Sequence, residues 1–198
     1  MTKNDGSYGK DGKLKDGECE AITSKNIPLL MEVAGTKEAV DWALCFLGCT
    51  RLMVANPCVV LDIDGTILLN VEGGVTKCVV HFSALCQSCK LHNIAIFCIT
   101  ARPEDPENRA YTVRQLEKCK VDPVHLYMRE PKVDYVAYKY KARKDITSQT
   151  YSILLCIGDQ FADLSKEKPP VEIDDSKTYV GQLVDNMQFG IKLPSEFL

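Results

Sequence analysis

Short apolar runs and amphipathic stretches alternate along most of this chain. The apolar runs are rich in valine, isoleucine and leucine and too short for buried helices, so they predict strands. They occupy residues 58–63, 94–99, 124–128, 152–157 and 178–183. The stretches between them repeat apolar residues at helical spacing and predict helices within residues 36–54, 76–92, 107–120 and 131–146. This alternation favours an α/β domain, Rossmann-like, with three layers around a central parallel sheet.

The same patterns divide the chain into three parts. Residues 1–18 are polar, with glycine, lysine and aspartate interspersed, and we expect a flexible N-terminal segment there. Residues 19–55 are expected to form a helical N-terminal extension, and residues 56–198 the main domain. Within that domain, residues 67–77 contain a Gly-Gly pair, which suits a tight turn, and predict a short hairpin or flap. The intervals between the strands leave no room for a large cap domain.

Composition and charge mainly exclude certain partners and targeting segments. The net charge of −3 offers no electrostatic attraction to nucleic acid or to an anionic membrane. The most apolar region, residues 42–61, is broken by arginine, asparagine and proline, so it predicts no membrane span. The polar first 18 residues lack the apolar centre of a signal peptide. Ten cysteines without a secretion signal indicate a reducing, cytoplasmic setting, with most of them as small core residues.

Acidic side chains stand at the ends of the predicted strands. Asp62 and Asp64 follow the first strand, and the two-residue period of a strand places both on the same side of the chain. Thr100 ends the second strand, and Asp159 and Asp163 follow the fourth. Open α/β sheets bind ligands at the carboxyl ends of their strands. Paired carboxylates there suit metal-assisted phosphoryl transfer, with one acid as nucleophile and one as proton donor; an acidic structural turn is the alternative.

In their order along the chain, four motifs resemble those of the haloacid dehalogenase-like (HAD) phosphohydrolases. They are Asp-Ile-Asp-Gly-Thr at 62–66, Ile-Thr-Ala-Arg-Pro at 99–103, a lysine before the fourth strand, and Gly-Asp-Gln-x-x-Asp at 158–163. Within this superfamily the chain is most similar to the class B acid phosphatases and the plant vegetative storage proteins. That likeness rests on Tyr138, Lys139 and Arg143 and on the Lys-Leu-Pro stretch at 192–194. Gly65 departs from the plant relatives, which usually carry glutamate there.

The resemblance implies a role for each matching residue. Asp62 would attack phosphorus and form an aspartyl-phosphate, and Asp64 would protonate the leaving oxygen and later activate water. Mg²⁺ would be held by the Asp62 side chain, the Asp64 main-chain carbonyl and Asp159. Asp163 would bind a metal-bound water or orient the site from outside the ligand set. The groups that bind the substrate phosphate would be the Thr100 hydroxyl, the Ala101 amide and the Lys139 ammonium.

Three nearby basic residues leave alternatives open. Lys141 is the second choice for the role of Lys139. Arg143 lies at i+4 from Lys139, so it either reaches the phosphate or pairs with an acid. Arg102 either contacts substrate or lies on the surface beside Pro103. Three tyrosines, at 135, 138 and 140, suit either a substrate pocket or helix packing.

The implied activity is that of a Mg²⁺-dependent phosphomonoesterase acting on a phosphorylated small molecule, with a nucleotide among the candidates. A polynucleotide end phosphatase of the same fold is an alternative that the acidic net charge disfavours. A storage or scaffold protein without activity is another. A structural zinc site from two cysteines and two histidines at 81–92 is disfavoured, because four ligands on one helix cannot surround a tetrahedral ion.

Overall fold

The computed structural model describes residues 30–71, 75–167, 173–183 and 189–195. The elements are, in chain order, β1 (Leu30–Val33), α1 (Thr36–Thr50), η1 (Arg51–Met53), β2 (Pro57–Leu61), β3 (Leu68–Val71), β4 (Val75–Cys78), α2 (Val80–Leu91), β5 (Ala95–Pro103), α3 (Pro106–Lys118), β6 (His125–Arg129), α4 (Tyr135–Ser148), β7 (Ser152–Gly158), η2 (Phe161–Asp163), β8 (Thr178–Gly181) and β9 (Phe189–Lys192). The labels η1 and η2 denote single turns of 3-10 helix.

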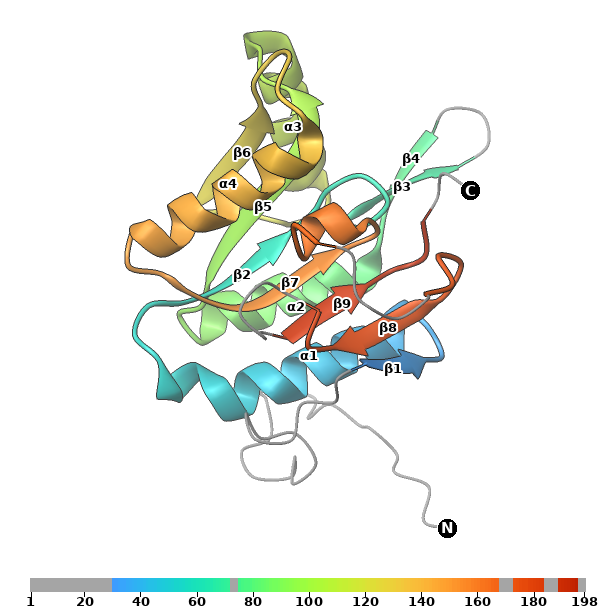
Figure 1. Ribbon diagram of the computed structural model, residues 1–198, viewed down its shortest axis with the longest axis vertical. Helices are drawn as coiled ribbons and strands as arrows, with labels where there is room; N and C mark the ends of the chain where they lie inside the picture. Colours follow the sequence, from blue (N-terminus) through green and yellow to red (C-terminus); the bar gives the residue numbers. More distant parts are fainter. Residues whose placement is uncertain (1–29, 72–74, 168–172, 184–188, 196–198) are drawn as a thin grey trace.

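A seven-stranded sheet forms the middle layer of the described part (Figure 1), with strand order β1-β8-β9-β7-β2-β5-β6. Strands β9, β7, β2, β5 and β6 run parallel; at one edge β8 pairs antiparallel with β9, and β1 pairs antiparallel with β8. The most central of the parallel strands is β2, which pairs with β7 on one side and with β5 on the other. The α/β, Rossmann-like architecture predicted from the sequence is confirmed.

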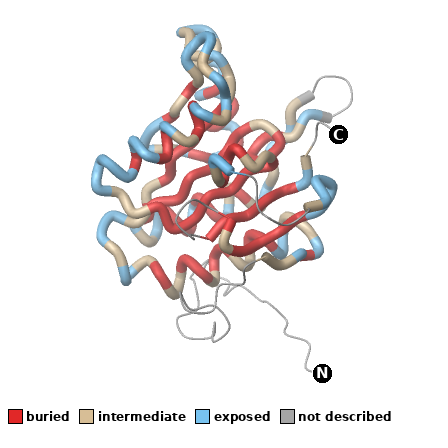
Figure 2. The backbone as a smooth tube through the Cα atoms, in the orientation of Figure 1, coloured by how far each residue is buried: buried red, intermediate tan, exposed pale blue. Residues whose placement is uncertain are grey.

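Helices cover both faces of the sheet, because alternate strand residues point to opposite sides. Val59 and Leu61 of β2 enter a core cluster with residues of α1 and α2, whereas Val60 packs with Tyr138 and Ile146 of α4. Figure 2 shows buried positions running along the central strands, between exposed outer surfaces of the helices. The parallel strands are therefore buried on both faces, as their continuous apolar runs predicted.

Two strands were not anticipated. Leu30–Val33 forms β1, which pairs with β8, so the expected helical extension over residues 19–55 begins, in its described part, with a strand of the main sheet. The helix that follows, α1, packs against the same core as α2. The predicted series of strands ended at residue 183, but Phe189–Lys192 forms β9 and inserts between β8 and β7. Residues 1–18 lie outside the described residues.

The predicted hairpin is present, although its helix begins later than expected. Strands β3 and β4 pair antiparallel, and the Gly-Gly turn between them lies outside the described residues. Residues 75–78, which the sequence assigned largely to a helix starting at 76, belong to β4, and α2 begins at Val80. No large cap domain is present in the described ranges, where this hairpin is the element inserted between β2 and α2.

Three of the described cysteines, Cys45 among them, are disulfide-bonded and so differ from the expectation of reduced thiols. Cys78, at the end of β4, forms a disulfide with Cys119, which follows α3. Among the other cysteines that the structure describes, those at 58, 86, 89, 98 and 156 are buried and form no disulfide, as expected for small core residues. The disulfide fastens the base of the hairpin to the end of α3. None of the described helices has the length and apolarity required to cross a membrane.

Candidate active site

The carboxyl ends of three neighbouring parallel strands form the candidate site. Leu61 of β2 lies in register with Ile157 of β7, and the Asp62 amide donates to the Ile157 carbonyl at 2.9 Å. The residues that follow β2 and β7 are therefore side by side. They border a pocket of about 370 Å³, lined by Asp62, Asp64, Asn70, Ala101, Arg102, Tyr135, Lys139, Asp159 and Gln160. The sequence prediction that strand ends far apart in the chain converge here is confirmed.

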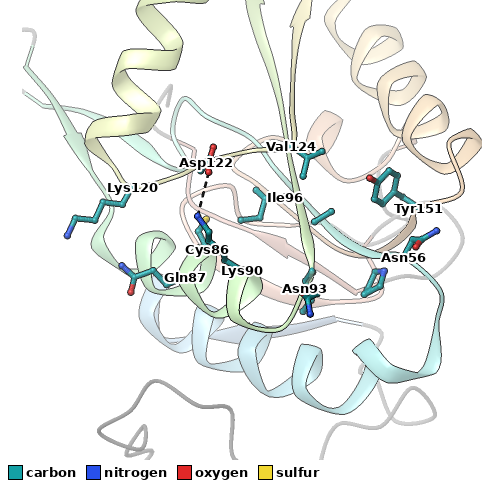
Figure 3. Close-up of a pocket in the computed structure, with 13 residues that line it drawn as sticks. Asn56, Cys86, Gln87, Lys90, Asn93, Ile96, Lys120, Asp122, Val124 and Tyr151 are labelled. Carbon is teal, nitrogen blue, oxygen red and sulfur yellow. Dashed lines mark ion pairs between the residues drawn. The ribbon is translucent and has the colours of Figure 1, made fainter.

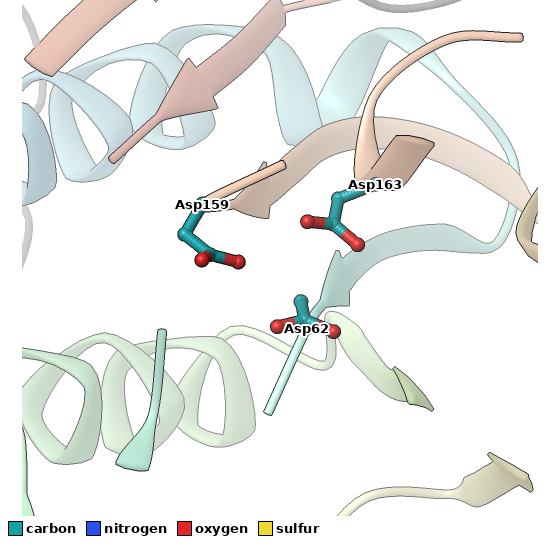
Figure 4. Close-up of side chains that lie close together, drawn as sticks. All are labelled: Asp62, Asp159 and Asp163. Carbon is teal, nitrogen blue, oxygen red and sulfur yellow. The ribbon is translucent and has the colours of Figure 1, made fainter. Parts of the chain in front are cut away.

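Three buried carboxylates meet at this edge (Figure 4). One oxygen from each of Asp62, Asp159 and Asp163 lies within 4.8 Å of the others. Their side chains approach from the ends of β2 and β7 and from η2, and all three residues are at most 5% exposed. The Lys139 ammonium donates to Asp62 Oδ1 at 2.7 Å and to Asp163 Oδ1. The cluster thus combines three acids with one base, shielded from water.

Local structure explains why Lys139 and Asp163 reach the cluster. The Asp134 side chain accepts a hydrogen bond from the Ala137 amide at 2.9 Å and caps the start of α4, so Lys139 lies in the second turn. It shares the buried face of α4 with Tyr138, Ala142, Arg143 and Ile146. In η2, the Gln160 amide donates to Asp163 Oδ2 at 2.9 Å, which leaves Oδ1 for the lysine.

Burial dominates the electrostatics of the cluster. Desolvation raises the pKa of Asp62 well above its usual value, the charge of Asp163 raises it further, and Lys139 only partly offsets both. Desolvation also raises the pKa of Asp159, to about 6, with a further contribution from Asp163. Burial lowers the pKa of Lys139, but the charges of Asp62 and Asp163 outweigh this and raise it overall.

This charge balance tests whether the residues suit a metal ion. With all three acids ionised, the cluster carries two more negative charges than Lys139 neutralises. A nearby cation stabilises the ionised form of buried carboxylates whose pKa values are raised. Hard divalent cations such as Mg²⁺ prefer oxygen ligands. The group therefore fits a hard divalent cation.

Two glycines keep the loops of the cluster close together. Gly65 has φ +77°, in the left-handed region that favours glycine, and a Cβ built there would lie 2.5 Å from Asp159 Oδ2. A Cβ at Gly158 would overlap Asp163. A side chain at position 65, such as that of glutamate, therefore does not fit the conformation of this loop.

Asp64 stands apart from the cluster, in an ion pair with Arg102. The guanidinium donates through Nε to Asp64 Oδ2 at 2.8 Å and through a terminal nitrogen to Oδ1 at 2.6 Å. Its other terminal nitrogen donates to Thr112 at 2.9 Å and Gln115 at 2.6 Å on α3. Arg102 thus lies in the pocket wall with a mostly buried side chain, and its contact with substrate stays a prediction. Sequence reasoning missed the two α3 residues, whose i, i+3 spacing was the available signal.

The other predicted residues are placed as follows. Thr100 is 1% exposed; its hydroxyl accepts from the Arg102 amide at 3.2 Å and lies 3.5 Å from Asp64 Oδ2. Ala101 lines the pocket, and Lys139, rather than the exposed Lys141, contacts the acids. A terminal nitrogen of Arg143 donates to the main-chain carbonyls of Ala162 and Asp163 at 2.7 and 3.0 Å, and so holds η2 in place.

Three further residues line the pocket. The sequence analysis left the role of Tyr135 undecided and gave no role to Asn70 or Gln160. Tyr135, at the start of α4, is 43% exposed and lines the pocket, whereas Tyr138 is buried in the core. Asn70 comes from β3 of the hairpin and Gln160 from the loop after β7. Asn70 belongs to a hairpin whose spatial position the sequence did not specify, whereas Gln160 directly follows Asp159 in the motif at 158–163.

A larger hollow, of about 560 Å³, lies at the opposite edge of the sheet (Figure 3). It is lined by the start of β2, the end of α2 and the loops beside β5. Its charged residues are Lys90, Lys120 and Asp122, and Lys90 is 3.8 Å from Asp122 in an exposed ion pair. It contains no cluster of acids, and it lies at the amino ends of the strands, away from the edge where such sheets bind ligands.

Comparison with known proteins agrees with an active site at the carboxyl ends of the strands. A family model described as HAD superfamily, subfamily IIIB (acid phosphatase), matches residues 71–194. The match includes Thr100, Lys139, Asp159 and Asp163, whereas Asp62 and Asp64 precede it. A search of the curated proteins found no match. Because the family model covers more than half of the chain and the fold agrees, this protein belongs to the subfamily IIIB acid phosphatases of the HAD superfamily and is a phosphoric monoester hydrolase.

Proposed function

We propose that this chain is a Mg²⁺-dependent phosphomonoesterase that transfers the phosphoryl group of its substrate to Asp62. The observation that carries the proposal is the buried group of Asp62, Asp159 and Asp163, with the Lys139 ammonium among them, at the carboxyl edge of the sheet. The ligands of the metal would be the Asp62 and Asp159 side chains and the Asp64 main-chain carbonyl, with Asp163 orienting the set. The bound cation would supply positive charge that lets a carboxylate approach a phosphate dianion.

Different residues of the chain then act in the two steps of the reaction. An Asp62 oxygen forms a bond to phosphorus while the bond from phosphorus to the leaving oxygen breaks, and Asp64 gives that oxygen its proton. In the second step, Asp64 takes a proton from a water molecule, and the water oxygen attacks phosphorus. The bond from phosphorus to the Asp62 oxygen breaks, which gives inorganic phosphate and free Asp62. The Thr100 hydroxyl, the Ala101 amide and Lys139 stabilise the phosphoryl oxygens.

The ion pair between Arg102 and Asp64 bears on the first of these steps. Asp64 uses both carboxylate oxygens to accept from the guanidinium, so it is not free to protonate a leaving group in this arrangement. A phosphate ester is a dianion and a stronger partner for a guanidinium than one carboxylate. We infer that substrate draws Arg102 toward its phosphate and releases Asp64 for proton transfer.

The substrate is a phosphorylated small molecule, and we propose that its leaving group carries an aromatic ring, as the nucleoside of a nucleotide does. Tyr135 is exposed and lines the pocket, so its ring offers a stacking surface. Asn70 adds amide groups that can hydrogen-bond a base edge.

The cytoplasmic setting stays a prediction from the sequence. The disulfide between Cys78 and Cys119 weighs against it, because such bonds persist mainly in oxidising compartments. Measuring whether these two cysteines are oxidised in protein recovered from its own cells would decide the question.

A pair of asparagine variants tests the nucleophile. Asp62→Asn should abolish hydrolysis of an aryl phosphate in the presence of Mg²⁺ while the far-ultraviolet circular dichroism stays that of the wild type. Asp122→Asn is the matched control, since that side chain is 87% exposed at the opposite edge of the sheet, and its rate should not change. EDTA should stop the wild type. Wild-type turnover by Asp62→Asn would contradict the proposal.

A further inference from the structure

The segment after β9 runs beside the loop that carries Asp159. Gly158 of β7 is in register with Lys192 of β9, and the Leu193 amide donates to the Gly158 carbonyl at 2.8 Å. Lys192 is fully buried, donates to the Leu193 carbonyl at 2.8 Å and lies 3.1 Å from a carboxylate oxygen of Asp175. These contacts fix the end of β9 against the site loop.

Ser195 continues this segment and contacts Asp159 directly. Its amide donates to the Asp175 carbonyl at 2.8 Å, which anchors its backbone. Its hydroxyl donates to the main-chain carbonyl of Asp159 at 2.9 Å and accepts from Gln160 Nε2 at 2.9 Å. The same Gln160 nitrogen donates to Asp159 Oδ2 at 3.2 Å. An amide nitrogen has two hydrogens, so both donations are satisfied together.

The result is a closed ring of hydrogen bonds around Asp159. Ser195 holds the main-chain oxygen, Gln160 holds one carboxylate oxygen, and the two side chains hold each other. Gly65 also lies close to this acid, since a Cβ built there would be 2.5 Å from Asp159 Oδ2. Without the serine hydroxyl, the Gln160 side chain loses its second acceptor and is free to rotate away from the acid.

We propose that Ser195, acting through Gln160, is a positioning residue that fixes Asp159 for binding the divalent cation. This rests on the proposed function, in which Asp159 is a metal ligand. Groups that orient ligands from outside typically change metal affinity by about 10- to 100-fold when they are removed. The stretch at 192–195 therefore sets the affinity for Mg²⁺, although it lies far along the chain from the four motifs.

Calorimetric titration of Mg²⁺ into the full-length, metal-free protein tests this proposal. Ser195→Ala should weaken binding about 10- to 100-fold. Ser195→Thr keeps the hydroxyl and should restore affinity toward that of the wild type. Ser148→Ala is the matched control: that hydroxyl donates to a main-chain carbonyl at 2.7 Å on the exposed end of α4, and its loss should leave binding unchanged. Hydrolysis by Ser195→Ala should fall more at limiting than at saturating Mg²⁺, which a merely structural defect would not produce.

A second variant protects the test against misfolding. Gln160→Leu removes the amide at similar volume and should weaken Mg²⁺ binding to a similar degree as Ser195→Ala. The inference is overturned if the wild type binds Mg²⁺ and both variants bind it equally well. If only one of the two variants folds, equal binding by that variant overturns it. If the wild type itself neither binds nor requires Mg²⁺, the proposed function fails first, so the two failures are distinguishable.

Discussion

Replacing Asp159 by asparagine removes a buried carboxylate whose pKa is raised to about 6, and the metal-free protein should become more stable as a result. A rise from the usual 3.8 corresponds to about 3 kcal/mol, at about 1.4 kcal/mol for each step of one in pKa. The folded pKa lies above the unfolded one, so the folded state holds the proton more tightly. The contribution to the free energy of unfolding is complete below about pH 4 and is lost as the pH rises through about 6.

The measurement is urea unfolding at pH 7.5 and at pH 4.5, each with EDTA and with Mg²⁺. In EDTA at pH 7.5, the free energy of unfolding of Asp159→Asn should exceed that of the wild type by up to about 3 kcal/mol. The difference between the two proteins should be smaller at pH 4.5. With Mg²⁺ at pH 7.5 the order should reverse, because only the wild type gains from binding the ion. Asp122→Asn, at its exposed position, controls for the substitution itself. A variant that is less stable than the wild type in EDTA at pH 7.5, or a gap independent of pH, would refute the reasoning.

Three further substitutions test the surroundings of the cluster. Lys139→Met leaves Asp62 and Asp163 without their buried cation and should lower the free energy of unfolding in EDTA by about 3–5 kcal/mol; an unchanged urea midpoint would exclude this role. Arg102→Met removes the guanidinium that is proposed to move from Asp64 to the substrate phosphate and should lower kcat/KM by about 100-fold, whereas wild-type kinetics would show the ion pair to be incidental. Tyr135→Ala should raise KM for phenyl phosphate about 2- to 12-fold and leave glycerol phosphate unaffected, and equal effects on both would argue against stacking.

The central strands and the position of the acids could be predicted from the sequence. The apolar runs of β2, β5 and β7 are continuous because these strands are buried on both faces, and this made them recognisable. Once they were parallel neighbours, the acids that follow β2 and β7 had to lie at one edge. Asp62 and Asp159 were therefore predictable from local pattern and general topology.

The edge strands and the supporting contacts were not predictable, for physical reasons. β1 is short and partly exposed, and β9 ends in the buried Lys192, so neither presents an apolar run. The pairing of Cys78 with Cys119 depends on how α3 packs near the hairpin, which spacing does not reveal. Ser195 reaches the site only because β9 inserts beside β7.

Anomalous diffraction from crystals grown with Mn²⁺ would test the central claim most directly. The account predicts one strong anomalous peak between the Asp62 and Asp159 carboxylates, about 2 Å from an oxygen of each. It also predicts that the peak disappears in Asp159→Asn crystals. A metal-dependent enzyme whose Mn²⁺ lies elsewhere, with both carboxylates unligated, would contradict it.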